Sequence, residues 1–221
     1  MKNLLQSVLV FGMIFLYTHS FGQSMEVGSD VIPAKIIQKT YLDILINGVG
    51  TNLNYGKFNS GLTDYKKSAL GIQAGLSFQA GISSHFSMIS ELYFIMRGGK
   101  LKANNPLTTS ESTLRFNTVE LPVLARIYLG NFHFNAGPSI AYNFSGTRKI
   151  EGLTSDLKFN NSIGGFKHVD TGVQMGGGYS FRVNQKRVTL DVRYCYGLTN
   201  ISYDKEIYNR NMLISLHFSK L

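Results

Sequence analysis

The chain has 221 residues, a formal net charge of +9, a single cysteine and no tryptophan. This length suits one domain, and one cysteine excludes an internal disulfide. A basic balance can indicate nucleic-acid binding, but the N-terminal residues resemble an export signal, and an exported chain rarely meets nucleic acid. We therefore expect the phosphates of anionic lipid or lipopolysaccharide, and no nucleic acid, as its counter-charge.

The first 22 residues have the pattern of a signal peptide. A positive charge at Lys2 precedes a long apolar run, and small residues follow at the positions that a signal peptidase reads. We expect a mature start near Gln23, a short periplasmic segment over 23–40 and a folded domain over 41–221. The alternative is an uncleaved anchor helix, but the apolar run is shorter than the ~20 residues that span a bilayer.

Alternating apolar and polar residues recur along the rest of the chain and predict strands with two different faces. From Leu70 to Ile82, every even-numbered residue is apolar and every odd-numbered one is Gly, Gln or Ser. Seven further segments follow this pattern with varying regularity, so we expect eight strands. Their approximate ranges are 42–55, 70–82, 86–98, 114–129, 132–144, 168–182, 188–198 and 211–219.

The connections between these strands alternate between short and long. The short ones lie at 83–84, 130–131 and 183–186, and the long polar ones at about 56–68, 99–113, 145–165 and 199–210. Short turns at one end and long loops at the other are typical of bacterial outer-membrane barrels. We therefore predict an all-β fold, an eight-stranded antiparallel up-and-down transmembrane β-barrel with both termini on the periplasmic side.

Aromatic residues lie near the ends of the apolar face, where the girdles of a membrane barrel meet the two interfaces. One predicted strand has Phe132 and Phe134 at one end and Tyr142 and Phe144 at the other. The alternative is a soluble eight-stranded barrel such as a lipocalin, which buries its apolar residues inside. Its outer face needs many Lys, Glu and Thr residues, whereas the polar face here is mainly Gly, Ser, Gln and Asn. This composition favours a confined polar lumen.

Charged residues within the predicted strands form the candidate site. Their positions in the alternating pattern direct them into the lumen, where ions need partners because desolvation is costly. The functional interpretation is a gate or an ion path. The structural interpretation is a plug of salt bridges, which we favour because an eight-stranded barrel is filled by its own side chains. The residues of this lumen charge network are Glu91, Arg97, Glu120, Arg126, Asp191 and Arg193.

Equal spacing on two neighbouring antiparallel strands predicts how four of these residues pair. We expect Arg97 beside Glu120 in an upper rung and Glu91 beside Arg126 in a lower one. Asp191 and Arg193 are expected to join these rungs from across the barrel.

Other residues with reactive side chains give weaker candidates, and we expect no catalytic, cofactor or metal site. His217 and Ser219 resemble the His-x-Ser pair of lipid A deacylases, but no carboxylate follows Ser219 and the pair faces the lumen. Cys195 points inward and is expected to pack as a small thiol. His133 and His168 have no evident metal-ligand spacing.

Two further features suit a membrane barrel. The glycines at 176–178 precede no helix that could hold a phosphate, so we expect them to permit close backbone packing inside the barrel. The predicted loops are rich in basic residues, which we expect to contact lipopolysaccharide phosphates. These residues are Lys57, Lys66, Lys67, Lys100, Lys102, Arg148, Lys149, Lys158, Lys205 and Arg210.

Six segments, in their order and spacing, also resemble a known family over about 40–221. They read ELYFIMRGG, VELPVLARIYLG, NAGPSIAY, DTGVQMGGGYSF, RYCYGLTNIS and NRNMLISLHF. In these segments the chain resembles the PorT-like outer-membrane β-barrel proteins of Bacteroidetes-type bacteria. It departs from the usual barrel-assembly signal at its end, which reads HFSKL instead of closing on an aromatic residue. The resemblance implies an outer-membrane barrel without a shared catalytic site and, for some members, an accessory part in protein secretion.

Together these observations predict a non-enzymatic barrel of the cell outer membrane that serves as an accessory, structural or binding protein of the envelope. Support of protein secretion is the finer expectation, with envelope or secretion proteins as partners. The alternatives are a small pore and a lipid-modifying enzyme. A filled lumen argues against the first, and an incomplete catalytic triad argues against the second.

Overall fold

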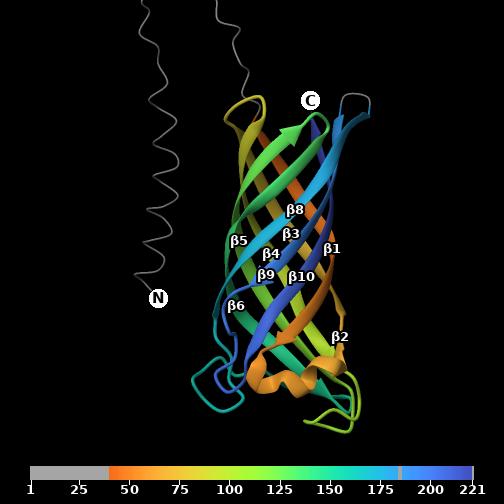
Figure 1. Ribbon diagram of the computed structural model, residues 1–221, viewed down its shortest axis with the longest axis vertical. Helices are drawn as coiled ribbons and strands as arrows, with labels where there is room; N and C mark the ends of the chain where they lie inside the picture. Colours follow the sequence, from red (N-terminus) through yellow and green to blue (C-terminus); the bar gives the residue numbers. More distant parts are fainter. Residues whose placement is uncertain (1–39, 184–185, 221) are drawn as a thin grey trace, which may run out of the picture. The chain divides into compact units, whose positions relative to one another are not determined.

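The computed structural model describes residues 40–183 and 186–220, in which eight long strands form a closed antiparallel barrel (Figure 1). The predicted signal peptide and nearly all of the predicted periplasmic segment lie outside these residues. The eight strands are β1 (Tyr41–Tyr55), β3 (Ala69–Gly81), β4 (Phe86–Leu101), β5 (Ser112–Leu129), β6 (Phe132–Ile150), β8 (Val169–Val183), β9 (Lys186–Gly197) and β10 (Ile207–Lys220).

Each strand pairs with the next along the chain, and β1 pairs with β10 to close the barrel. The predicted eight-stranded up-and-down architecture is confirmed. Several strands extend into segments that were predicted as loops, because their antiparallel ladders continue there. For example, β6 runs on to Ile150 and pairs with the short strand β7 (Leu153–Asp156), and the end of β4 pairs with β2 (Lys66–Lys67).

The two ends of the barrel differ as the loop lengths predict. The short connections lie at the same end as the end of β10, and the long loops and the 3₁₀ helix η2 (Lys57–Tyr65) lie at the other (Figure 1). Gly130 has a φ of 65°, which a two-residue hairpin turn requires and which glycine adopts without strain. Within the described residues, no helix combines the length and apolar character needed to cross a membrane.

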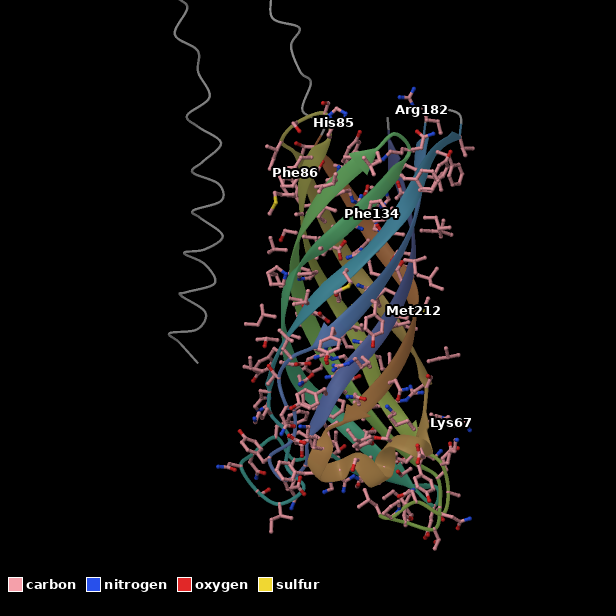
Figure 2. The ribbon with its side chains drawn as sticks, viewed as in Figure 1. Lys67, His85, Phe86, Phe134, Arg182 and Met212 are labelled. Carbon is pink, nitrogen blue, oxygen red and sulfur yellow. The ribbon has the colours of Figure 1, made fainter. Side chains whose placement is uncertain are left out.

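The alternation of the sequence separates the outside of the barrel from its inside. On β3, Leu70 is 81% exposed and Leu76 is also exposed, whereas Gln73 and Gln79 are buried. Apolar residues cover the other strands in the same way, and Figure 2 shows Met212 on this outer surface. Each such side chain left in water would lose roughly 1.5–3 kcal/mol of the transfer free energy that burial provides. This outer face therefore argues against the soluble barrel and fits contact with lipid.

Candidate functional site in the lumen

The structure places all six residues of the lumen charge network inside the barrel, and none of them is more than 4% exposed. They lie on β4, β5 and β9, at the inward positions that period-two alternation assigns. Together with residues of β6, β8 and β10 they form two polar clusters. We call them the lower cluster, on the side of the short turns, and the upper cluster, on the side of the long loops. Figure 1 draws the long loops at the bottom, so these names are reversed in that view.

The lower cluster is centred on Arg193 and Asp191 of β9. The Arg193 guanidinium forms two hydrogen bonds of 2.8 Å with the carboxylate of Glu91, and its Nε lies 3.1 Å from Asp191 Oδ1. Arg126 Nη2 donates to Asp191 Oδ2 over 2.8 Å, and His133 Nε2 lies 2.9 Å from the same oxygen. These paired, bidentate contacts compensate the desolvation of ions held away from water.

The upper cluster is centred on Arg97 of β4. Its Nη1 lies 3.4 Å from Glu120 Oε2, which is the pairing that the upper rung predicts. Its Nη2 lies 2.9 Å from Asp170 Oδ2, an acid that sequence analysis did not include in the network. Asn209 donates to the same carboxylate over 2.8 Å. The inward position of Asp170 in the alternating pattern of β8 was a signal that could have identified it.

Gln174 of β8 connects the two clusters. Its Nε2 donates to Glu120 Oε1 over 2.9 Å and to the Tyr93 hydroxyl over 2.7 Å. Its Oε1 accepts a longer hydrogen bond, of 3.5 Å, from Arg193 Nη1. A continuous set of hydrogen bonds therefore joins the upper and lower clusters.

The predicted lower rung between Glu91 and Arg126 is wrong, because these residues pair with Arg193 and Asp191 instead. The β4–β5 register places Arg126 opposite Ser87, which is four residues before Glu91. Both predicted rungs required a register shifted by these four residues. The contact between Arg97 and Glu120 still forms because the long arginine side chain reaches along the lumen.

Two glycines of β8 make room for the lower cluster. A Cβ at Gly176 would collide with the carbonyl oxygen of Val192 and lie 2.7 Å from the side chain of Arg193. A Cβ at Gly178 would lie 2.6 Å from the His133 ring. The close packing predicted inside the barrel is therefore present at Gly176 and Gly178, where it accommodates two members of the charged site. Gly177 lies between them on the outward face, beside the exposed ring of Phe134.

Apolar residues fill the lumen between and beyond the polar clusters. The middle cluster lies between them along β4 and β9 and consists of Leu45, Val49, Tyr93, Ile95, Cys195 and Leu213. The cap cluster lies at the end of the long loops and consists of Leu53, Tyr55, Leu62, Leu101, Phe116, Phe166, Ile201 and Ile207.

The cap cluster is also absent from the sequence-based prediction, in which the long loops are polar. Leu62, Phe166 and Ile201 come from these loops, and the Phe166 ring packs edge-on against Phe116 of β5 at 5.1 Å between centroids. Large apolar residues within otherwise polar loops were the available signal. They indicate loops that fold into the mouth of the barrel.

Comparison with known proteins agrees with this architecture. A family model described as the outer membrane protein beta-barrel domain matches residues 45–203. The chain belongs to this family. As a member of it, the protein is located in the cell outer membrane, and the apolar outer face contacts lipid. No curated protein matches the sequence.

Solved structures of outer-membrane proteins resemble this outer-membrane barrel at low sequence identity. Neisserial surface protein A is 11% identical, with a TM-score of 0.47 over 82% of this chain and 98% of that one. The Yersinia pestis attachment invasion locus protein Ail, solved with the heparin analogue sucrose octasulfate, is 10% identical, with a TM-score of 0.43 over 82% and 99%. The E. coli outer membrane protein W is 12% identical, with a TM-score of 0.38 over 81% and 97%.

The His-x-Ser candidate of the outer-membrane barrel differs from its sequence-based description. The side chain of Ser219 lies outside the described set, but His217 is buried in the lumen with its Nδ1 4.0 Å from Asp43 Oδ2. Asp43 precedes Ser219 by most of the chain, so no sequence pattern indicated this carboxylate, which β1 brings close to His217 of β10 when the barrel closes. The wall separates His217 from the lipid outside, where a deacylase substrate would lie.

The other candidate residues, Cys195, His133 and His168, have packing or hydrogen-bonding contacts within the barrel. Cys195 packs in the middle cluster, and His133 belongs to the lower cluster. His168 bonds through Nδ1 to the carbonyl oxygen of Asn143 over 2.7 Å, and its ring stacks on Phe159. Among the described residues, no group of three or more His, Cys, Asp or Glu side chains is arranged to hold a metal ion.

The basic residues of the loops include a small ion-pair cluster. Glu111 lies 3.0 Å from Lys67 Nζ and 3.4 Å from Lys100 Nζ. The hydrogen bond and the positive charge of Lys67 lower the pKa of the Glu111 carboxyl below its usual value, with a smaller contribution from Lys100. Part of the basic charge predicted to face lipopolysaccharide is thus neutralised within the protein.

Proposed function

We propose that this outer-membrane barrel is a sealed, non-enzymatic accessory or binding protein of the cell envelope that acts through its surfaces. The observation that carries the proposal is the filling of the lumen at successive levels. Along β4, Glu91 belongs to the lower cluster, Tyr93 and Ile95 to the middle cluster, Arg97 to the upper cluster and Leu101 to the cap cluster.

The filled lumen argues against the alternative of a small pore. A crevice beside Arg97, Glu120 and Asp170 measures about 10 Å³, which is room for roughly one water molecule. An ion would have to break hydrogen-bonded ion pairs and displace two apolar clusters to pass. The lipid-modifying enzyme is also disfavoured, because His217 is enclosed by the barrel wall.

The loop end of the barrel supports a binding role. Phe58, Leu107 and Ile163 belong to three different loops and are 89%, 56% and 94% exposed. Large exposed apolar patches often mark interaction surfaces, and these three side chains are apolar groups that the loops offer to a partner. Support of protein secretion is the narrower proposal, and it rests on the resemblance to the PorT-like barrels.

Two measurements test this proposal. In planar bilayers, the purified barrel should produce no stable conductance steps, and steady conductance would contradict the sealed lumen. In native outer membranes, a photo-crosslinking amino acid at Phe58 or Ile163 should capture envelope or secretion proteins. The same probe at the lipid-facing Ile44 is the matched control, and equal protein capture from all three positions would contradict a binding surface at the loops.

A further inference from the structure

A groove of about 510 Å³ lies on the outside of the barrel across β1, β9 and β10, near the long loops. Two basic residues, Lys66 and Arg210, line it together with uncharged polar residues, aromatic residues and Met212. None of the described residues that line it is acidic. Neither Lys66 nor Arg210 forms a salt bridge within the described part of the chain.

Gly50 lines this groove, and below it, toward the periplasm, the outward face of β1 has a second glycine at Gly48. β1 presents large apolar residues outward at Leu42, Ile44 and Ile46, and then presents Gly48 and Gly50. A Cβ at Gly48 would meet nothing within 4 Å, and one at Gly50 would meet only a backbone oxygen at 3.9 Å. No close packing within the barrel requires glycine here, so the missing side chains leave an open furrow.

The strand register places bulky walls on both sides of these two glycines. Gly50 is opposite Leu70 of β3 on one side and Met212 of β10 on the other. Gly48 is likewise flanked by Ile72 and Ile214. All four flanking side chains are exposed on the lipid face. The result is an apolar furrow in the outer half of the barrel wall, closed toward the periplasm by Ile46.

Polar and cationic groups meet the furrow at its upper end. Arg210 is opposite Asn52, which is two residues, or about 6.6 Å, above Gly50 on the outward face of the same strand. Its guanidinium stacks 3.5 Å from the Tyr196 ring centroid and donates through Nη1 to the carbonyl oxygens of Gly197 and Asn209. These contacts hold the cation at the edge of the furrow while it stays partly exposed.

Lys66 provides the second cation. Its Nζ lies 3.1 Å from Asn54 Oδ1, an uncharged acceptor that leaves the positive charge uncompensated. A second groove of similar volume provides the contrast, since it contains Glu111 and Glu151 beside its basic residues, and Lys100 is paired there with Glu111. Of these two grooves, the groove at Lys66 and Arg210 is therefore the better match for an anion, because no carboxylate lines it.

We propose that this groove binds a phosphorylated glycolipid of the outer leaflet, with one acyl chain in the glycine furrow and a phosphate at Arg210 and Lys66. Cations beside an apolar furrow at the membrane interface match a molecule with an anionic head and a hydrocarbon chain. An arginine stacked on an aromatic ring binds phosphate oxygens well, and so does a lysine. This inference goes beyond the proposed function and does not depend on the sealed lumen.

Native mass spectrometry of the detergent-solubilised full chain tests the site with monophosphoryl lipid A as the probe. The unmodified protein should retain one lipid. The double variant Lys66→Gln, Arg210→Gln should bind the lipid at least about tenfold more weakly, because two charge-assisted contacts are lost. Gly50→Leu should also weaken binding several-fold by filling the furrow, and Lys100→Gln, in the acid-containing groove, is the matched control.

Further arms separate the parts of the ligand. Dephosphorylated lipid A should bind as weakly as the double variant binds the intact probe, and glucosamine 4-phosphate without acyl chains should not displace the lipid. Each variant is first shown to fold by its altered mobility on an unheated gel. Equal lipid retention by the double variant or by Gly50→Leu overturns the proposal, as does equal binding of the dephosphorylated probe.

Discussion

The bidentate contact between Glu91 and Arg193 gives the sharpest test of the lumen. We predict that Glu91→Gln and Arg193→Gln each lower the free energy of unfolding by roughly 3–5 kcal/mol, because each leaves a buried charge without its partner. The double variant should lose clearly less than the sum of the two. A coupling energy near the upper part of the usual ~0.5–3 kcal/mol range is expected.

The magnitude follows from the geometry. Both hydrogen bonds measure 2.8 Å, and each side chain is about 1% exposed. Two hydrogen-bonded ions with charge centres about 4 Å apart attract each other by ~4 kcal/mol at an effective dielectric constant near 20. Because the pair is buried, added salt should change the coupling little.

Urea unfolding of the barrel in lipid vesicles measures these energies. Since the chain has no tryptophan, circular dichroism and the mobility of unheated samples on gels are the suitable signals. The matched cycle combines Glu91→Gln with Arg126→Gln, whose guanidinium bonds Asp191 instead. Coupling to Arg126 as large as coupling to Arg193 would refute the observed pairing and restore the lower rung predicted from the sequence.

Three further predictions concern the wall, the lumen and the loops. Leu76→Arg puts a cation on the lipid face and should lower the stability of the folded barrel by ~2–4 kcal/mol. The inward Gln73→Arg should reduce the folded fraction less than Leu76→Arg does. A greater loss from Gln73→Arg would contradict the assignment of faces. Gly176→Ala forces a methyl group against the neighbouring backbone and should cost about 1–3 kcal/mol, so an unchanged urea midpoint would contradict it. The pKa of Glu111, followed by NMR, should lie below its usual value and should rise in Lys67→Gln. The ion pair with Lys67 forms above the lowered pKa and is lost as the pH falls through it. An unchanged pKa in the variant would contradict the contact.

The strands and their two faces can be predicted from the amino-acid sequence. Between Leu70 and Ile82 the side-chain period of two leaves no ambiguity, because a shift by one residue would exchange the lipid and lumen faces. The same parity directed Glu91, Arg97, Glu120 and Arg126 inward. The three short connections required antiparallel neighbours, and their alternation with four long loops predicted the up-and-down topology.

The contacts between inward residues, in contrast, depend on how the strands are staggered in the closed barrel. Arg193 reaches Glu91, and Asp43 approaches His217, only after the sheet closes, and closure depends on the stagger between every pair of strands. Alternation within one strand carries no information about that stagger, so a four-residue error in the β4–β5 register left the faces correct and the partners wrong. The cap cluster and the groove at Arg210 were hidden for the same reason. Their residues are far apart in sequence, and the register and the closed barrel bring them together.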